Sequence, residues 1–587
     1  MPSSPGPFAA VLTLVTSPRT RTSVFLAAAA LVTAIAVALT FRRAITPWSS
    51  LPDSDYWGNI SGIVTETGMR LDLDTLLRHN NEHIVVIPKL VYAANYLLTS
   101  GSNAGLIVYS LAVGIAITAL LLFLAREILI DTPWRLLLCA LLFPLVMFSA
   151  KLTHSYFLGM SGTIWLTADL FVILSAAALA RAVTAESSIW LLLSLLAALI
   201  GVLAYSTAIY MLIVLVTFCA AKLLRPKLPG PSSRPVLLGT AIAALFVLGL
   251  GAAFRNAPKA KPDFAFDIIG LVEFVLIYLG NAFTTGPMRL VAGIIILGAG
   301  VASIWRLAVE RRIEETLLWV ILFFFAPFNA LMTGIGRLGY GVKIAATSRY
   351  QSVTAITLIA MIVLVLAALP KTASSRRKIV WRNVAFGALL ACAAVIAIDR
   401  SYVANYTARN ERKVVAEIAM RQGIEGSQHL KAATPAFGQL ERAIPVLRAA
   451  THAPFHWRSR CEGLIGQTIA EPAGPVVGRI ETASAYKVLR GDSQALELSG
   501  FAERNGVTAE CIVLVDGTRT AIGAGAPVIK RPDVEQAAGR SLCLAGWKGV
   551  ASAPKAMPVC ALALFPGEDE LRPLDGCQAA GNSPATR

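Results

Sequence analysis

Residues 104–125 read AGLIVYSLAVGIAITALLLFLA, a segment without a single charged side chain. A helix of about 20 apolar residues crosses the hydrocarbon core of a bilayer, which is about 30 Å thick. Backbone groups in lipid must be bonded within their own segment, so this segment is predicted to be a membrane-spanning helix. Similar apolar blocks recur along the chain from Ser23 to Ile398. The expected spans are 23–40, 104–125, 134–150, 161–180, 188–204, 207–222, 236–254, 288–305, 316–334, 351–369 and 383–398.

The expected fold class is an all-α polytopic membrane domain over residues 23–400, with about eleven transmembrane helices. The apolar run 188–222 is divided at Ala204–Thr207, because one helix of that length would overshoot the bilayer. A stretch in the first loop, Ile84–Leu98, is interrupted by Pro88 and is too short and polar to span, so it is expected to lie in the membrane interface.

Composition agrees with a membrane protein. Hydrophobic residues make up 56% of the chain and charged residues 15%, against about 25% charged in an average soluble protein. The formal net charge of +17 raises nucleic acid as a partner, but the basic residues lie mostly in short turns and not on one continuous face. We therefore expect no nucleic-acid partner. Basic flanks suit membrane lipids, their headgroups and lipid phosphates.

Basic residues also give the expected orientation. Lys and Arg concentrate before the first span and in alternate turns such as 222–234, which places residues 1–22 in the cytoplasm. An odd number of spans then puts the tail outside, as in a multi-pass protein of the bacterial inner (cytoplasmic) membrane. Arg42 and Arg43 oppose this orientation. Alternatively, the first block is a signal peptide with a cleavage site at Ala36–Ala38.

Residues 401–587 are expected to form a soluble periplasmic α+β domain. The segment Ala404–Ile424 has a helical pattern, and the run Ile512–Val515 predicts a strand that ends at the turn pair Asp516-Gly517. An oxidising compartment would permit two disulfides and leave one thiol, without fixing the pairing. The cysteines of this domain are Cys461, Cys511, Cys543, Cys560 and Cys577.

The first outer loop, residues 41–103, carries the clearest candidate chemistry. Asp53 and Asp55 lie just beyond the first span. A carboxylate there could take a proton from a hydroxyl nucleophile or help to hold a divalent cation. In the alternative interpretation, Asp53 or Ser54 caps an interfacial helix.

A second group in the same loop combines proton-active and hydrogen-bonding side chains. His79, Glu82 and His83 lie close together, and Lys89 follows them. Two histidines four residues apart would share one face of a helix and could bind a metal. A solvated loop with local caps is the alternative.

A third group of candidates is expected at the outer ends of later helices. Cations on this side run against the positive-inside trend, and Arg and Lys suit phosphate recognition. Ordinary headgroup contact is the alternative. The residues are Lys151, His154, Arg337, Lys343, Arg349 and Tyr350. Asp169 and Glu273 also lie near or within apolar segments, and the sequence assigns them no role.

Together these features resemble the GT-C superfamily of membrane glycosyltransferases, which use polyprenyl-phosphate sugars. The resemblance rests on Asp53-Ser54-Asp55 in a large first outer loop, an interfacial helix there, many spans and a C-terminal extracytoplasmic domain. Asn81-Glu82-His83 and Ser348-Arg349-Tyr350 are similar to patterns in bacterial membrane proteins of this kind. The resemblance covers about residues 20–400, while the tail resembles no family.

The resemblance implies transfer of a sugar from a lipid-linked donor to an envelope glycan or lipid acceptor, with inversion at the anomeric carbon. Asp53 or Asp55 would deprotonate the acceptor hydroxyl. Arg349, with Arg337 or Lys343, would stabilise the departing lipid phosphate.

The same resemblance gives Glu82 and His83 a role in orienting substrate or in a second proton site. Some members of the superfamily need a divalent metal such as Mg or Mn, and the sequence leaves this open. Three other functions are considered: a transporter or flippase of a lipid-linked glycan, a membrane scaffold whose tail binds a partner, and an O-antigen-ligase-like enzyme. A flippase would move lipid-linked sugar without forming a glycosidic bond.

Overall fold

The structure is a computed structural model that describes most of the chain. The described residues are 18–53, 55–66, 68–80, 83–253, 267–283, 286–370, 401–424, 430–431, 437–472, 474–486, 495–552 and 557–579.

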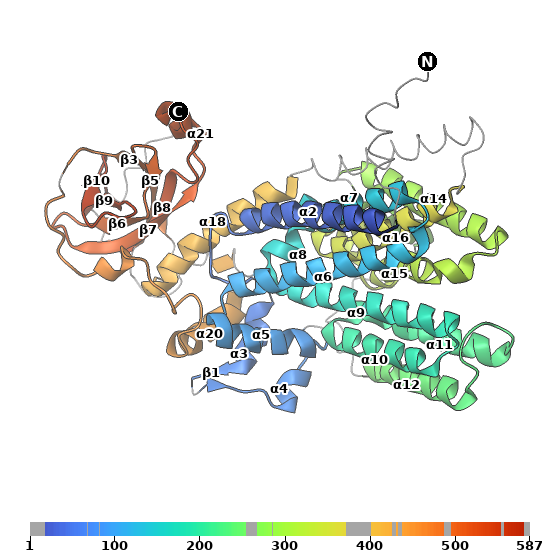
Figure 1. Ribbon diagram of the computed structural model, residues 1–587. Helices are drawn as coiled ribbons and strands as arrows, with labels where there is room; N and C mark the ends of the chain where they lie inside the picture. The colour runs from blue at the N-terminus through green and yellow to red at the C-terminus, as the bar shows by residue number, and fades with distance from the viewer. Residues whose placement is uncertain are drawn as a thin grey trace, which may run out of the picture.

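Within these residues, eight helices are long and apolar enough to cross a membrane. They run side by side in one bundle (Figure 1). The helices are α2 (Pro18–Ala44), α6 (Asn103–Leu129), α7 (Pro133–Met147) continued by η1 (Ala150–Leu152) and α8 (Thr153–Phe157), α9 (Gly159–Thr184), α11 (Ile209–Leu224), α14 (Met288–Val309), α15 (Ile313–Arg337) and α16 (Gln351–Ala368). Three shorter apolar helices are α10 (Ser188–Ala204), α12 (Arg234–Ala253) and α13 (Ile268–Gly280).

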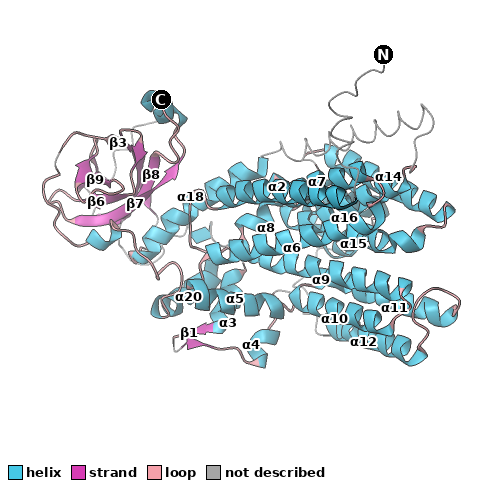
Figure 2. Cartoon of the chain, in the orientation of Figure 1, coloured by secondary structure: helices cyan, strands magenta, loops and turns pink. Residues whose placement is uncertain are grey.

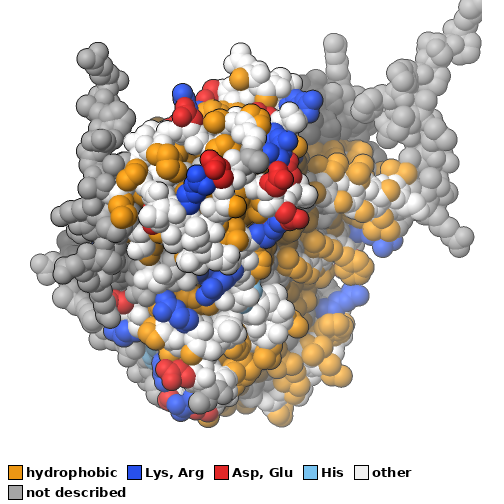
Figure 3. Space-filling view, turned by 90° about the vertical axis from the view of Figure 1, so that its left-hand side faces the viewer, with side chains coloured by type: hydrophobic (Ala, Val, Ile, Leu, Met, Phe, Trp, Pro, Cys, Tyr) orange, Lys and Arg blue, Asp and Glu red, His pale blue; other side chains and the backbone are white. Residues whose placement is uncertain are grey.

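The eight long helices coincide in position with eight of the expected spans, and the expected spans 188–204 and 236–254 coincide with the shorter α10 and α12. The expected span 383–398 lies outside the described residues, and α13 matches no expected span. The division of the run 188–222 is confirmed: Tyr205 is extended, with φ −166° and ψ 151°, and ends α10 before η2 (Ser206–Ala208). Large apolar side chains cover the outside of the bundle, for example Leu196, Phe246 and Trp305. Figure 3 shows them gathered behind the more polar C-terminal domain. This surface suits contact with lipid.

Small residues let neighbouring helices approach closely. A side chain at Gly162 of α9 would collide with Ser110 of α6, and one at Gly293 of α14 would collide with the backbone of Leu276 of α13. Small residues at helix contacts are a common device in membrane bundles, where the hydrophobic effect does not hold helices together.

The first loop folds over one end of the bundle. Its elements are α3 (Tyr56–Ile63), β1 (Val64–Thr65), β2 (Gly68–Met69), α4 (Leu73–Leu77) and α5 (Val86–Thr99). The helix expected at 84–98 is α5. Asp72 caps α4 by accepting a hydrogen bond from the backbone N–H of Thr75. We call this end of the bundle the loop face.

The C-terminal domain lies at the same end of the bundle and is α+β, as expected (Figures 1 and 2). It begins with α18 (Ser401–Arg421), α20 (Phe437–Ala449) and η6 (Glu462–Leu464), and α21 (Pro532–Ala538) lies between strands. Its antiparallel nine-stranded sheet has the order β10-β9-β6-β7-β8-β4-β3, with β11 paired to β9 and β5 to β4. The strands are β3 (Gly478–Tyr486), β4 (Ala495–Arg504), β5 (Val507–Thr508), β6 (Cys511–Val515), β7 (Ala521–Ile529), β8 (Gly546–Ser552), β9 (Pro558–Leu564), β10 (Leu571–Pro573) and β11 (Gln578–Ala579).

Two predictions for this domain are confirmed. The predicted strand is β6, and the turn at Asp516-Gly517 follows it. Disulfides join Cys461 to Cys511 and Cys560 to Cys577, which leaves Cys543 as an exposed free thiol.

The helix α18 connects the sheet to the bundle. Val414 and Ile418 pack in the apolar layer of β6 and β7, while Val415 and Ala419 pack against Val550 of β8. The opposite face of the helix is polar and turns toward the first loop.

Candidate functional site

Asp53 is buried where the first loop meets α18. Its Oδ1 accepts a hydrogen bond from Nη2 of Arg409, and Nζ of Lys413 lies 3.7 Å from its Oδ2. The side chains of Asp53 and Lys413 are completely buried, whereas that of Arg409 is 24% exposed. Burial lowers the pKa of the Lys413 ammonium, against the opposing effect of Asp53, and Arg409 lowers it further. Two basic side chains therefore face one carboxylate.

A hydrogen-bonded group centred on His154 lies beside this ion pair. Nδ1 of His154 lies 2.6 Å from the hydroxyl of Tyr406 and 3.2 Å from that of Ser348, and these two hydroxyls are 3.1 Å apart. Nε2 lies 2.9 Å from the hydroxyl of Ser161. The group joins α8, α9, the short η5 (Ser348–Tyr350) and α18.

Electrostatic contacts connect the two groups. Both Arg349 and Arg409 lie within electrostatic range of the His154 ring. The guanidinium of Arg349 also lies over the ring of Tyr350, 5.3 Å from its centroid. We call this set the loop-face cluster: Asp53, His154, Arg349, Tyr406, Arg409 and Lys413.

A row of aromatic rings runs from the first loop into the bundle. His83 contacts Tyr205, and Tyr205 contacts Trp165, both with ring centroids 4.5 Å apart. Trp165 meets Tyr350 at 5.8 Å, and Tyr350 stacks on Tyr278 at 4.8 Å. Nδ1 of His83 also lies 2.9 Å from the hydroxyl of Ser206. The row brings together two predicted site residues, His83 and Tyr350, that are far apart in the sequence.

Further buried hydrogen bonds and ion pairs follow along α18, from Asp53 toward the C-terminal end of the helix. Glu417 accepts hydrogen bonds from the Ser49 hydroxyl at 3.0 Å, from the Ser50 backbone N–H at 3.1 Å and from the Ser50 hydroxyl. Arg421 bridges Glu417, at 2.9 Å, and Glu462, at 2.7 Å. These contacts of Glu417 and Arg421 hold the loop that carries Asp53 against the C-terminal domain.

The remaining predicted residues of the first loop have different surroundings. Asp55 is half-buried at the N-terminus of α3, where its side chain makes no cap, and it lies within electrostatic range of Tyr92. The expectation that His79 and His83 share a helix face is wrong, because neither residue is helical and His83 pairs with Asn80 as an antiparallel bridge. Glu82 lies outside the described residues.

Backbone carbonyls accept the hydrogen bonds of the Lys89 ammonium. It donates to the carbonyl oxygens of Thr75 at 2.9 Å, Leu76 at 3.2 Å and Arg78 at 2.5 Å, at the C-terminal end of α4. Burial lowers its pKa to about 8, and Arg78 contributes to the shift. This geometry gives Lys89 a capping function, and its contact with substrate stays a prediction.

The other predicted basic residues are divided between the interior and the surface. Lys151 is completely buried in η1, which packs between α16 and α18. Arg337 ends α15, and Lys343 is exposed in η4 (Val342–Ala346), which packs on α13. Among the predicted basic residues, Arg349 is the one whose charge acts on the His154 group.

Sequence analysis missed Tyr406, Arg409 and Lys413. A signal was present, because Arg409, Lys413, Glu417 and Arg421 recur every four residues in a predicted helix and so share one face. A charged stripe of this kind in a soluble domain is usually solvated, and the sequence did not indicate that it would face the first loop.

The described residues contain no group of three or more His, Cys, Asp or Glu side chains that could hold a metal ion. Next to Asp53, the positive charges of Arg409 and Lys413 would repel a divalent cation. The surroundings of Asp53 therefore do not fit a divalent metal.

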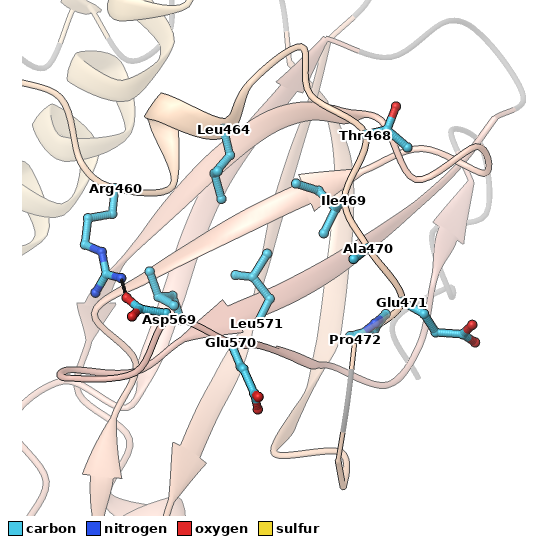
Figure 4. Close-up of a pocket in the computed structure, with 11 residues that line it drawn as sticks. Arg460, Leu464, Thr468, Ile469, Ala470, Glu471, Pro472, Asp569, Glu570 and Leu571 are labelled. Carbon is cyan, nitrogen blue, oxygen red and sulfur yellow. Dashed lines mark hydrogen bonds and ion pairs between the residues drawn. The ribbon is translucent and has the colours of Figure 1, made fainter.

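A separate pocket of about 450 Å³ lies in the C-terminal domain (Figure 4). Its floor is apolar, with Leu464, Ile469 and Leu571 pointing toward one another. At one side, Arg460 pairs with Asp569 at 2.5 Å and with Glu510 at 3.5 Å. The residues predicted from the sequence do not line this pocket.

The chain matches no protein-family model, no curated protein and no solved structure. A functional conclusion therefore depends on the loop-face cluster itself.

Proposed function

We propose that this protein transfers a sugar from a polyprenyl-phosphate donor to a hydroxyl of an envelope glycan or lipid acceptor, with inversion at the anomeric carbon. The supporting observation is the position of Asp53. A first-loop carboxylate lies at the end of a lipid-facing helix bundle, with Arg349 and Arg409 near the same histidine. A base and cations for a lipid phosphate are the two requirements of such a transfer.

In the proposed step, the acceptor oxygen bonds to the anomeric carbon on the face opposite the phosphate. Asp53 takes the proton of the acceptor hydroxyl. The bond between the anomeric carbon and the phosphate oxygen breaks, and its electron pair leaves with the lipid phosphate. Arg349 and Arg409 stabilise that charge, and Tyr406 and His154 supply hydrogen bonds at the same place.

Asp53 is preferred to Asp55 as the base because of its neighbours. Asp53 pairs with Arg409, one of the two cations that would bind the phosphate, whereas Asp55 lies within electrostatic range of Tyr92. The proposed step uses no metal, since the surroundings of Asp53 do not fit one.

The proposal includes a membrane arrangement. About eleven spans would place the N-terminus in the cytoplasm of a bacterium, and the loop face and C-terminal domain in the periplasm, where lipid-linked sugars meet envelope acceptors. Membrane lipids would surround the bundle, and no nucleic acid is involved.

The test is direct product formation. Purified full-length protein is incubated with a panel of polyprenyl-phosphate sugars and extracted envelope glycans or lipids, and products are detected by mass spectrometry. We expect Asp53→Asn to lower transfer by a factor on the order of 100, as for loss of a general base. The matched control is Asp74→Asn, which changes a mainly exposed first-loop acid and should leave transfer unchanged.

Asp53→Asn also removes the partner of buried Lys413, so folding must be checked separately. The double variant Asp53→Asn/Lys413→Met removes both charges, and its elution as a single peak in detergent reports the fold. Normal transfer by a folded variant without Asp53 would contradict its role as the base.

A transporter or flippase is the second candidate, and one observation favours it. Asp169 is a completely buried acid within the membrane span α9, and such acids often mark ion or proton pathways. Purified protein in liposomes separates the candidates: a flippase moves labelled lipid-linked sugar across the bilayer without forming a new glycosidic bond.

A further inference from the structure

One face of α9 carries Ser161, Trp165 and Asp169 at four-residue spacing. Ser161 binds His154 of the loop-face cluster, and Trp165 contacts Tyr350 in the aromatic row. Asp169 lies roughly 12 Å along the helix from Ser161, at 1.5 Å per residue. The face therefore leads from the loop-face cluster into the interior of the membrane bundle.

Asp169 has few polar neighbours among the described residues at that depth. Its side chain is completely buried, and neither carboxylate oxygen has a hydrogen bond to any described residue. Ser352 of α16 lies beside the carboxylate, but its hydroxyl also makes no hydrogen bond of regular geometry within the described chain. The hydroxyls of Tyr278 and Tyr350, which stack on each other, are likewise buried without a hydrogen-bond partner among these residues.

No described basic side chain offsets the carboxylate. Tyr156 of α8 and Tyr278 of α13 are the titratable groups within its electrostatic range, and the hydroxyl of Tyr156 already donates to the carbonyl of Met147 at 2.9 Å. The helices α10 and α16 carry no charged residue. The other elements in contact with α9 also carry titratable groups. These are Lys89, Tyr92 and Tyr96 on α5, Tyr109, Arg126 and Glu127 on α6, His154 on α8, Tyr210, Cys219 and Lys222 on α11, Glu314, Glu315 and Arg337 on α15, and Arg349 and Tyr350 on η5. None of these exerts a charge effect on Asp169.

A charged carboxylate in this position is very unfavourable, because the described residues around it provide no basic side chain to compensate its charge. We propose that Asp169 is a proton-binding site inside the membrane domain. It exchanges its proton with the loop face along the face of α9 that carries Ser161 and Trp165. A sodium ion fits less well, because it needs several oxygen ligands and, among the described residues, Ser352 is the one hydroxyl within hydrogen-bonding range of the carboxylate. The inference does not depend on the proposed transfer of sugar.

Two measurements on the full-length protein test the site without an activity assay. In the first, membranes are treated with apolar dicyclohexylcarbodiimide, which reacts with protonated carboxyl groups, from about pH 5 to pH 9. We expect an adduct on the peptide that contains Asp169, with a yield that falls as pH rises and the proton is lost. A water-soluble carbodiimide with an amine should modify exposed Asp74 and leave Asp169 unmodified.

The second measurement is an infrared spectrum of purified protein. We expect the carbonyl band of a protonated carboxylic acid in the wild type and its loss in Asp169→Asn. Tyr278→Phe should slow the deuterium exchange of this band, because it removes a buried hydroxyl within electrostatic range of Asp169. Tyr156→Phe is the matched control, since its hydroxyl is already bonded to Met147.

Three results would overturn the proposal. One is an infrared spectrum that is unchanged by Asp169→Asn. Another is labelling of Asp169 that is independent of pH. The third is loss of both signals when sodium replaces choline at constant pH, which would assign the site to a metal cation.

Discussion

The carboxylate of Asp53 forms ion pairs with two basic side chains, and one of them, Lys413, is completely buried. A buried ion pair adds little to stability compared with apolar residues of the same size, but removal of one partner leaves an uncompensated charge. The contribution of Asp53 to folding should therefore depend on whether Lys413 is present.

We expect Asp53→Asn to destabilise the protein by about 3–5 kcal/mol, the usual result of breaking a buried pair. Adding Lys413→Met should recover most of this loss, because both charges are then absent. Thermal unfolding in detergent, followed by tryptophan fluorescence, measures both effects. Asp74→Asn breaks a mainly exposed pair and should change the unfolding temperature very little. Equal midpoints for the single and double variants would contradict the coupling.

At the level of single residues, the sequence indicated half of the loop-face cluster. Asp53, His154 and Arg349 were recognisable as polar side chains next to apolar blocks. Their partners were not, because Arg409 is 356 positions from Asp53 and no local pattern reports such a contact. The histidine pair at 79 and 83 was misjudged because four-residue spacing brings side chains together only in a helix, and neither histidine is helical.

Among the elements, α20 and the segment after it hold the first loop to the C-terminal domain. The ring of His452 stacks on Tyr96, and Nε2 lies 2.9 Å from the hydroxyl of Tyr56 of α3. Nδ1 lies 2.8 Å from the carbonyl of Ala453, so Nδ1 donates there and Nε2 accepts from Tyr56. Gly101, with φ +76°, lies so close to the ring that a side chain would collide with it.

This contact should weaken in acid. Burial lowers the pKa of His452 from 6.5 to about 4, and the Ala453 carbonyl opposes the shift. Between pH 6.5 and about pH 4, His452 binds a proton in the unfolded chain but not in the folded protein. The contribution of His452 to the free energy of unfolding is therefore present above pH 6.5 and is lost as pH falls toward 4. Unfolding temperatures from pH 7.5 to 4.5 should therefore fall more steeply for the wild type than for His452→Phe, which keeps the stacked ring. Parallel curves would contradict this assignment.

Element positions were largely predictable from the sequence. Long apolar blocks gave the helices of the bundle, and local patterns gave α5, α18 and β6. The packing of α18 and α20 on the first loop was not predictable, because the charges of α18 suggest a solvated helix unless the opposite surface is known.

On the scale of the whole molecule, the first loop and the C-terminal domain lie at the same end of the bundle (Figure 1). Both must therefore be on one side of the membrane. The exposed free thiol of Cys543 can report which side this is.

We expect a membrane-impermeant maleimide to label Cys543 in intact spheroplasts, since the proposed arrangement places the C-terminal domain outside. Cys543→Ser should remove the label. In that background, Lys227→Cys, in an exposed turn at the other end of the bundle, should react after the membrane is permeabilised and not before. Labelling in the reverse order would place the loop face in the cytoplasm and exclude the proposed periplasmic reaction.

The 356 positions between Asp53 and Arg409 also affect biogenesis. At synthesis rates of about 5–20 residues per second, the first loop emerges roughly 20–70 s before its partner helix is made. During this interval the nascent loop holds an acidic side chain at the membrane surface without its final cationic neighbours. A ribosome that stops before α18 would thus leave an inserted but unfinished protein, which quality-control proteases could recognise by its undocked loop.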